Sequence, residues 1–127
     1  LYASASYLAR RPIKNPGELS AHALLLPASG VELKWIRQLV SDAKPAFVSD
    51  VSLALAEAAR ADAGVTVLPR YLGDSMPALV HIPMPRPPSE TLWLTVHRDL
   101  RKTPRVRVLL DFLVAATRSD KGLLRGN

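Results

Sequence analysis

The segment from Ala46 to Tyr71 has the clearest pattern of apolar and polar positions in the chain. The strand-forming residues 47–48 come first, and residues 53–61 then make an Ala- and Leu-rich run that favours a helix. Three residues between them favour a helix N-cap: Ser49, Asp50 and Ser52. After Gly64, which can end a helix, residues 65–68 form a second apolar run. This order predicts a strand–helix–strand unit, which in α/β folds places a helix N-terminus where small polar ligands bind.

Shorter patterns predict the elements that precede this unit. Residues 1–4 can end a strand, and residues 6–11 can form a short helix. The sequence Asn-Pro-Gly-Glu opens a short helix over residues 15–22, because Asn can cap it, Pro suits the first helical position and Glu suits the third. Residues 24–26 read as a buried strand. Residues 30–41 alternate like a strand and also fit a helical period, and we favour the helix.

The patterns after the unit predict a strand, a crossover, a second strand and a long helix. Residues 78–82 form the first strand, and the proline-rich residues 83–88 form an extended connection. Residues 92–97 alternate like a strand, and Thr-Pro then opens a helix over residues 103–117. Four apolar residues recur at helical spacing and predict its buried face: Val106, Leu109, Leu110 and Leu113. Residues 119–127 are expected to form a flexible tail.

The final strand and helix have few obvious partners among the earlier elements. A sheet normally needs more strands than this part of the chain supplies. The chain also begins with Leu1, which is too large to be left by removal of an initiator methionine. We therefore expect a fragment of a longer protein. Such a fragment should self-associate, with the strand at residues 92–97 pairing across chains.

Composition and charge narrow the classes of protein that fit. The 127 residues are 48% hydrophobic and 22% charged, which is typical of one soluble domain. The absence of cysteine excludes disulfides, thiolate metal sites and a cysteine nucleophile, and it is compatible with the cytosol. The net charge of +6 can indicate nucleic-acid binding, but the basic residues are scattered in pairs without interleaved aromatic residues. A solvated basic surface is the favoured interpretation.

No pattern of metal-ligating or catalytic residues stands out. His22, His81 and His97 are far apart, and none has His, Asp or Glu at ligand spacing. Ser, His and Asp are all present, but no nucleophile-elbow motif and no phosphate loop occurs. We therefore expect neither an enzyme nor a cofactor or metal ion.

Four segments together resemble the effector-binding domain of LysR-type transcriptional regulators. They are LYASASYLARR at 1–11, NPGELSAH at 15–22, AFVSDVSLALAEAARADAGVTVLPRYL at 46–72 and LWLTVHRDLRKTPRVRVLLDFLV at 92–114. The resemblance covers about residues 1–115. Its most specific parts are the Ser-Asp helix start, the strand that ends in Leu-Pro, and the closing His-x-x-Leu-Arg, Pro-Arg-Val-Arg and Asp-Phe-Leu segment. One departure occurs at residues 62–64, which are Asp-Ala-Gly where the family often has Gly-Leu-Gly.

The resemblance implies a fold and a function. The fold would be α/β, a periplasmic-binding-protein-like (type 2) lobe with a strand and helix returning from the other lobe. Residues 1–88 would form the second lobe and residues 89–118 the returning elements. A small-molecule effector would bind between the lobes and control the geometry of a DNA-bound homo-oligomer in the cytoplasm. DNA would be contacted only by an N-terminal helix-turn-helix absent from this chain, and no membrane contact is implied. The alternative is a solute-binding lobe of a transport-type protein.

The strand-to-helix junction supplies the first candidate effector contacts. Ser49 and the amides of Val51 and Ser52 can bond a ligand carboxylate or another polar group. The same atoms would also satisfy ordinary N-capping, and the two roles can coexist. Asp50 would repel an anion, so it is expected to cap the helix or to accept a hydrogen bond from a ligand.

The end of the next strand completes the candidate set. Pro69 and Arg70 follow that strand directly. Arg70 could neutralise an acidic ligand, although a solvated arginine is the commoner case. Tyr71 is expected to pack beneath the loop. The candidate effector-binding residues are therefore Ser49, Asp50, Val51, Ser52, Pro69 and Arg70.

Overall fold

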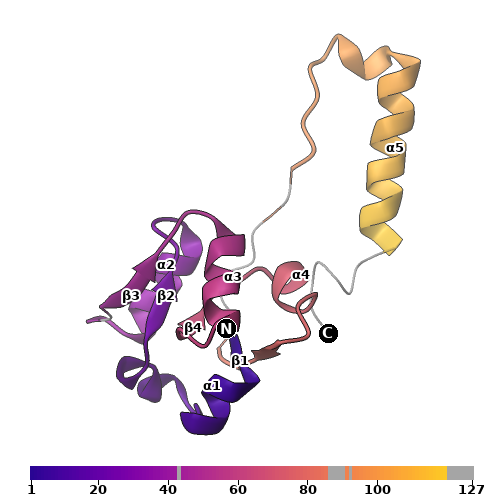
Figure 1. The fold of residues 1–127 in the computed structure, drawn as a ribbon. Coiled ribbons are helices and arrows are strands. Elements are labelled where there is room, and N and C mark those ends of the chain that lie inside the picture. The colour runs from indigo at the N-terminus through magenta and orange to yellow at the C-terminus, as the bar shows by residue number, and fades with distance from the viewer. Residues whose placement is uncertain (43, 86–90, 92, 120–127) are drawn as a thin grey trace. The chain divides into compact units, whose positions relative to one another are not determined.

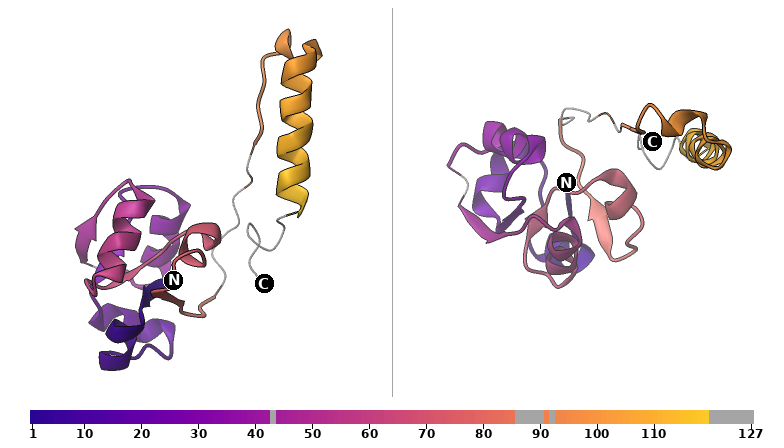
Figure 2. Two further views of the ribbon diagram at one scale, coloured as in Figure 1. Left: turned by 45° about the vertical axis from the view of Figure 1, so that its right-hand side comes forward. Right: turned by 90° about the horizontal axis from the view of Figure 1, so that it is seen from above.

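The computed structural model describes residues 1–42, 44–85, 91 and 93–119. The chain divides into two compact units, Leu1–Pro88 and Ser89–Asn127. Each is described by itself (Figures 1 and 2).

A five-stranded sheet forms the centre of the first unit (Figure 1). Its strands, in chain order, are β1 (Tyr2–Ser4), β2 (Leu24–Leu26), β3 (Pro45–Val48), β4 (Val65–Thr66) and β5 (Leu79–His81). Their order across the sheet is β3-β2-β4-β1-β5. Strand β2 pairs in parallel with β3 and β4, and β1 pairs antiparallel with β4 and β5. The sheet is therefore parallel on one side and antiparallel on the other.

The helices of this unit confirm most of the sequence pattern. They are α1 (Ala5–Arg10), the 3₁₀ helix η1 (Pro16–Ala21), α2 (Val31–Leu39), α3 (Ser52–Arg60) and α4 (Arg70–Gly73). Of the ambiguous residues 30–41, residues 31–39 form helix α2, which confirms the favoured interpretation within one or two residues at each end. The predicted strand–helix–strand unit is β3-α3-β4, although β4 ends at Thr66, two residues earlier than expected. The two strands of this unit are not neighbours, because β2 lies between them.

Alternate residues of β2 face two separate parts of the core. Leu24 and Leu26 belong to one buried cluster with Trp35 and Ile36 of α2. Leu25 belongs to another cluster, whose other buried members are Tyr2, Leu55, Ala56, Ala59, Leu68 and Leu79. Successive side chains of a strand point to opposite faces of the sheet. Helices α2 and α3 therefore cover opposite faces, and the central strand is apolar on both.

The second unit contains the 3₁₀ helix η2 (Leu100–Lys102) and helix α5 (Pro104–Ser119). The helix predicted for residues 103–117 is confirmed. The strand predicted for residues 92–97 is wrong for residues 93–97, which run beside α5 without strand pairing (Figures 1 and 2). A strand needs a second strand to bond its N–H and C=O groups. The described residues of this unit supply only helices. Leu92 lies outside the described residues.

The predicted buried face of α5 is also wrong. Leu109 is 55% exposed, and the other three residues of that face (Val106, Leu110 and Leu113) are only partly covered. Within the described part of this unit, the element that α5 contacts is the short helix η2. Of the expected tail, Ser119 is the last residue of α5, and residues 120–127 lie outside the described residues. Residues 86–88 of the proline-rich connection lie outside them as well.

Candidate functional site

A depression of about 160 Å³ lies at the carboxyl ends of the parallel strands of the first unit. Its lining residues come from the turn after β2, the start of α2, the start of α3 and the end of β4. They are Pro27, Ser29, Glu32, Asp50, Ser52, Leu55, Val67 and Pro69. In α/β folds, ligands bind beyond the carboxyl ends of the strands, so the topology points to this depression as the candidate site.

Gly30 shapes the turn after β2, and this turn forms one wall of the depression. Its φ of 98° lies in the left-handed region, which glycine adopts at little cost. A Cβ atom at this position would lie 2.8 Å from the Oε2 atom of Glu32. The glycine therefore lets the chain turn sharply from Ser29 into α2. The turn places Ser29 and the first-turn residue Glu32 together in the lining of the depression.

The junction between β3 and α3 makes the opposite wall. The Ser49 amide donates to the Leu26 carbonyl oxygen at 3.2 Å, which joins this turn to the end of β2. The Ser49 Oγ accepts a hydrogen bond from the Val51 amide at 3.1 Å. The Val51 amide is therefore already occupied by a protein acceptor. The turn places Asp50 and Ser52 in the lining.

The predicted N-cap of α3 is wrong. The N-cap residue is Val51, whose side chain offers no acceptor, and no side chain caps the helix there. The amides of Ser52 and Leu53, in the first turn, have no acceptor within the described residues. Helix α3 begins at Ser52, one residue before the predicted run of residues 53–61, and the Ser49 hydroxyl bonds the Val51 amide within the turn and does not cap the helix. Two backbone donors therefore remain at the N-terminus of α3.

The polar groups that line the depression are of two kinds. Glu32 and Asp50 contribute carboxylates, and Ser29 and Ser52 contribute hydroxyl groups. No Arg, Lys or His is among the lining residues that the structure describes. The carboxylates can accept hydrogen bonds from a ligand, and the hydroxyl groups can donate or accept. Leu55 and Val67 form the apolar floor.

Arg70 does not line the depression and instead belongs to a separate hydrogen-bond network. Its Nε donates to Oδ2 of Asp74 at 2.9 Å, and its Nη1 lies 3.2 Å from Nε2 of His81. The Tyr2 hydroxyl donates to the other carboxylate oxygen of Asp74 at 2.6 Å. Burial opposes ionisation of Asp74, but the bonds from Tyr2 and Arg70 outweigh it and lower the pKa of that carboxyl. Burial, and then the bond to Asp74, raise the pKa of Tyr2.

Apart from Arg70, which belongs to the network with Asp74 and His81, the candidate residues fall into two groups. Asp50, Ser52 and Pro69 line the depression, whereas Ser49 and Val51 shape the turn behind it. The sequence interpretation missed Ser29 and Glu32, together with Pro27, Leu55 and Val67. A serine stands between a strand and each of the two helices that contribute to the depression, Ser29 before α2 and Ser49 before α3. That repeated pattern is the signal that could have identified the second wall.

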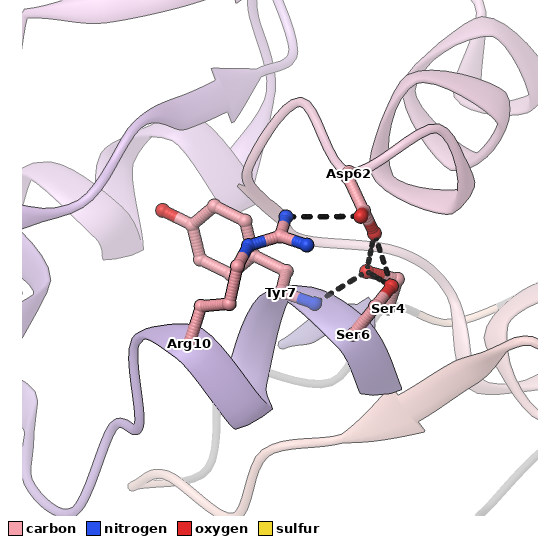
Figure 3. Close-up of polar contacts among 5 residues, drawn as sticks. All are labelled: Ser4, Ser6, Tyr7, Arg10 and Asp62. Atoms are coloured by element: carbon pink, nitrogen blue, oxygen red, sulfur yellow. Dashed lines mark hydrogen bonds and ion pairs between the residues drawn. The ribbon is translucent and has the colours of Figure 1, made fainter.

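A second polar cluster fastens the other end of α3 (Figure 3). Asp62 has a φ of 65°, in the left-handed region. The Ala63 amide donates to the Ala58 carbonyl oxygen and the Asp62 amide to the Ala59 carbonyl oxygen, the two bonds of a Schellman motif. Glycine is the usual residue at this position, and aspartate tolerates it better than most residues do. Both hydrogen bonds of the motif form although residues 62–64 are Asp-Ala-Gly and not Gly-Leu-Gly.

The Asp62 carboxylate has three side-chain partners, all from the segment around α1 (Figure 3). It accepts hydrogen bonds from Ser4, from Ser6 at 2.5 Å and from Arg10 at 2.9 Å. The Ser4 hydroxyl also caps α1 by accepting from the Tyr7 amide at 3.0 Å. The bonds from Ser4, Ser6 and Arg10, in that order, lower the pKa of Asp62 to about 2. The cluster joins α3 to α1 and leaves the depression at the opposite end of the helix.

The described residues contain neither a candidate metal site nor a candidate membrane span. Among them, no group of three or more His, Cys, Asp or Glu side chains could hold a metal ion. None of the described helices is long and apolar enough to cross a membrane.

Comparison with known protein families identifies the family of this chain. Residues 1–118 match the family model described as the LysR substrate binding domain. No curated protein and no solved structure was found to match the chain. The match covers both units, from β1 to α5. Domains of this family belong to regulatory proteins, and they bind the effectors of LysR regulators. The chain belongs to the LysR substrate binding domain family.

Proposed function

We propose that this chain senses a small-molecule effector for a cytoplasmic LysR-type transcription regulator and that the depression is one wall of its binding cleft. The family match over residues 1–118 carries the proposal. The position of the depression at the carboxyl ends of β2 and β4 supports it. Residues 1–88 would form one lobe and residues 89–118 the elements that return from the other.

The proposed partners of the chain are the effector, further copies of the same protein, and DNA. The effector shifts the relation of the two lobes and so the geometry of a DNA-bound homo-oligomer. DNA is contacted by a helix-turn-helix outside these residues, as the family resemblance implies. Nothing in the comparisons supports the alternative of a transport-type solute-binding lobe.

The candidate contacts differ in how they would serve a ligand. Asp50, Ser52 and Pro69 would touch it directly, because they line the depression. The amides of Ser52 and Leu53 would bond a ligand acceptor at the start of α3. Ser49 and Val51 would hold the shape of the turn. Arg70 would reach the ligand only after leaving its partners Asp74 and His81.

A thermal-shift screen of amino acids, dicarboxylates and aromatic acids tests the binding site. We expect a compound that stabilises the chain to bind about threefold to tenfold more weakly to Ser52→Ala, which loses one hydrogen-bonding hydroxyl. Ser20→Ala is the matched control, because Ser20 is an exposed serine whose hydroxyl bonds only the Gly17 carbonyl oxygen. Equal affinity of both variants for the compound would count against the depression as the site.

An electrophoretic shift assay tests the regulatory role. The gene product that contains this chain should bind DNA upstream of neighbouring genes, and the stabilising compound should change the shift. The failure of that gene product to bind any such DNA would count heavily against regulation.

A further inference from the structure

The imidazole of His81 takes part in a network that holds helix α4 against the antiparallel edge of the sheet. The helix has only four residues, Arg70–Gly73, so its own hydrogen bonds give it little stability. Its attachment depends on side chains. Tyr2 of β1 and Arg70 of α4 bond the two oxygens of the Asp74 carboxylate, and Arg70 also reaches His81 of β5.

The bond between Arg70 and His81 exists only for the neutral imidazole. The guanidinium of Arg70 has donors and no acceptor, so Nε2 of His81 must be the acceptor and the ring proton must sit on Nδ1. Protonation of the ring puts a proton on Nε2 and sets two cations 3.2 Å apart. The contact then changes from attraction to repulsion.

The groups around His81 favour its neutral form. Arg70 faces the ring from α4, and Tyr2 of β1 packs against it in a tilted arrangement, with ring centroids 5.3 Å apart and an angle of 60° between the ring planes. Asp74 of the same α4 segment favours the cation, and the amino group of Leu1 opposes it. Burial, then the Leu1 amino group and Arg70, outweigh Asp74 and lower the pKa of His81. The bond is therefore present at neutral pH and is lost in mild acid.

The start of α4 connects this contact to the depression. The Pro69 carbonyl oxygen accepts hydrogen bonds from the amides of Leu72 and Gly73, each at 3.0 Å. Pro69 also lines the depression. Any loosening of α4 therefore acts on a residue that lines the depression.

We propose that His81 is a proton-operated latch, which holds α4 on the sheet edge when neutral and releases it when protonated. Helix α4 would then loosen in mild acid, and so would the lining of the depression at Pro69.

Amide exchange in the uniformly ¹⁵N-labelled whole chain tests the latch. The protection factors of Leu72, Gly73 and Asp74, corrected for the intrinsic pH dependence of exchange, are compared between pH 5 and pH 8. We expect them to fall about threefold or more at the acid end. His81→Gln keeps an acceptor that does not titrate, so its protection factors should stay constant.

Two controls separate the latch from general acid effects. In His22→Gln the fall should persist, since His22 contacts Tyr7 and not α4. It should also persist in a chain with an acetylated N-terminus, which lacks the Leu1 charge. Protection factors that do not change in the unmodified chain, or that fall equally in His81→Gln, would overturn the proposal.

A ring titration gives a second, independent readout. In Arg70→Gln the guanidinium charge is gone, so the pKa of His81 measured by NMR should rise from its lowered value. An unchanged His81 pKa in this variant would show that the two side chains are not coupled, and the latch would be rejected.

Discussion

Asp62 shows how one side chain can make an unfavourable backbone position usable. The left-handed conformation at its position suits glycine, and a carboxylate at the C-terminus of α3 is opposed by the helix dipole. The hydrogen bonds from Ser4, Ser6 and Arg10 compensate, because they hold the carboxylate ionised and place it at the N-terminus of α1. The sequence shows the missing glycine, but it does not show these partners, which lie more than fifty positions away.

The lowered pKa of Asp62 predicts a pH dependence of stability. The folded-state pKa of about 2 is below the ordinary value of 3.8, so the unfolded chain binds the proton more readily. The contribution is therefore fully present above about pH 4 and is lost as the pH falls towards 2. Urea unfolding of Asp62→Asn should show less acid dependence than the unmodified chain between pH 4 and pH 2.

Asp99→Asn is the control for this measurement, because Asp99 is highly exposed and its nearest cations, on His97 and Arg98, lie 3.5 and 4.0 Å away. An acid dependence in Asp62→Asn that equals that of the unmodified chain would contradict the assignment.

Gly64 is required by close packing at the entry to β4. A Cβ atom at this position would overlap the carbonyl group of Ala23, which cannot move without disturbing the hydrogen bond from the Val65 amide. Gly64→Ala should therefore destabilise the chain by about 2 kcal/mol or more. In Gly17→Ala the nearest atom would be the flexible Asn15 side chain at 3.3 Å, and the loss should stay within about 0.5 kcal/mol. Similar unfolding midpoints in urea for both variants would refute this account.

At the level of helices and strands, the sequence predicts elements that depend on neighbouring residues. It misses features that depend on contacts between segments far apart in the chain. Helices α1, α2, α3 and α5 and strands β1, β2 and β5 follow from composition, caps and periodicity. The strand expected at 92–97 does not form because a strand depends on a partner, which a local pattern cannot supply. The wall formed by Ser29 and Glu32 depends on β2 lying between β3 and β4, an order that the sequence does not reveal.

The uncapped start of α3 offers a test at this scale. Val51 is the N-cap and is 59% exposed, so its side chain contributes little packing. Val51→Ser supplies an acceptor for the first-turn amides and should be about 1 kcal/mol more stable than Val51→Ala. Thermal unfolding of the pair gives the difference. A serine variant no more stable than the alanine variant would show that the first-turn donors are already satisfied.

The second unit, taken by itself, exposes several large apolar side chains. Trp93 is 82% exposed, Val108 70% and Phe112 66%. Large exposed apolar side chains gathered in one unit favour association. The expectation that the chain self-associates therefore stands as a prediction, with the second unit as the surface that joins the copies.

Sedimentation velocity over a range of concentrations checks this expectation. We expect the mean sedimentation coefficient to rise with concentration in the unmodified chain and to rise less in Phe112→Ser. Tyr71→Ser, which removes an exposed aromatic side chain of the first unit, should behave like the unmodified chain. A clean monomer at high concentration would reject the prediction.

We have proposed that the depression beside α3 binds a small-molecule effector. The most direct measurement is the map of amide chemical-shift changes in the ¹⁵N-labelled whole chain when a compound from the thermal-shift screen is added. We expect the largest changes at Ser29, Asp50, Ser52 and Leu53. Changes that gather instead around Asp62 or along α5, with the depression unaffected, would contradict it.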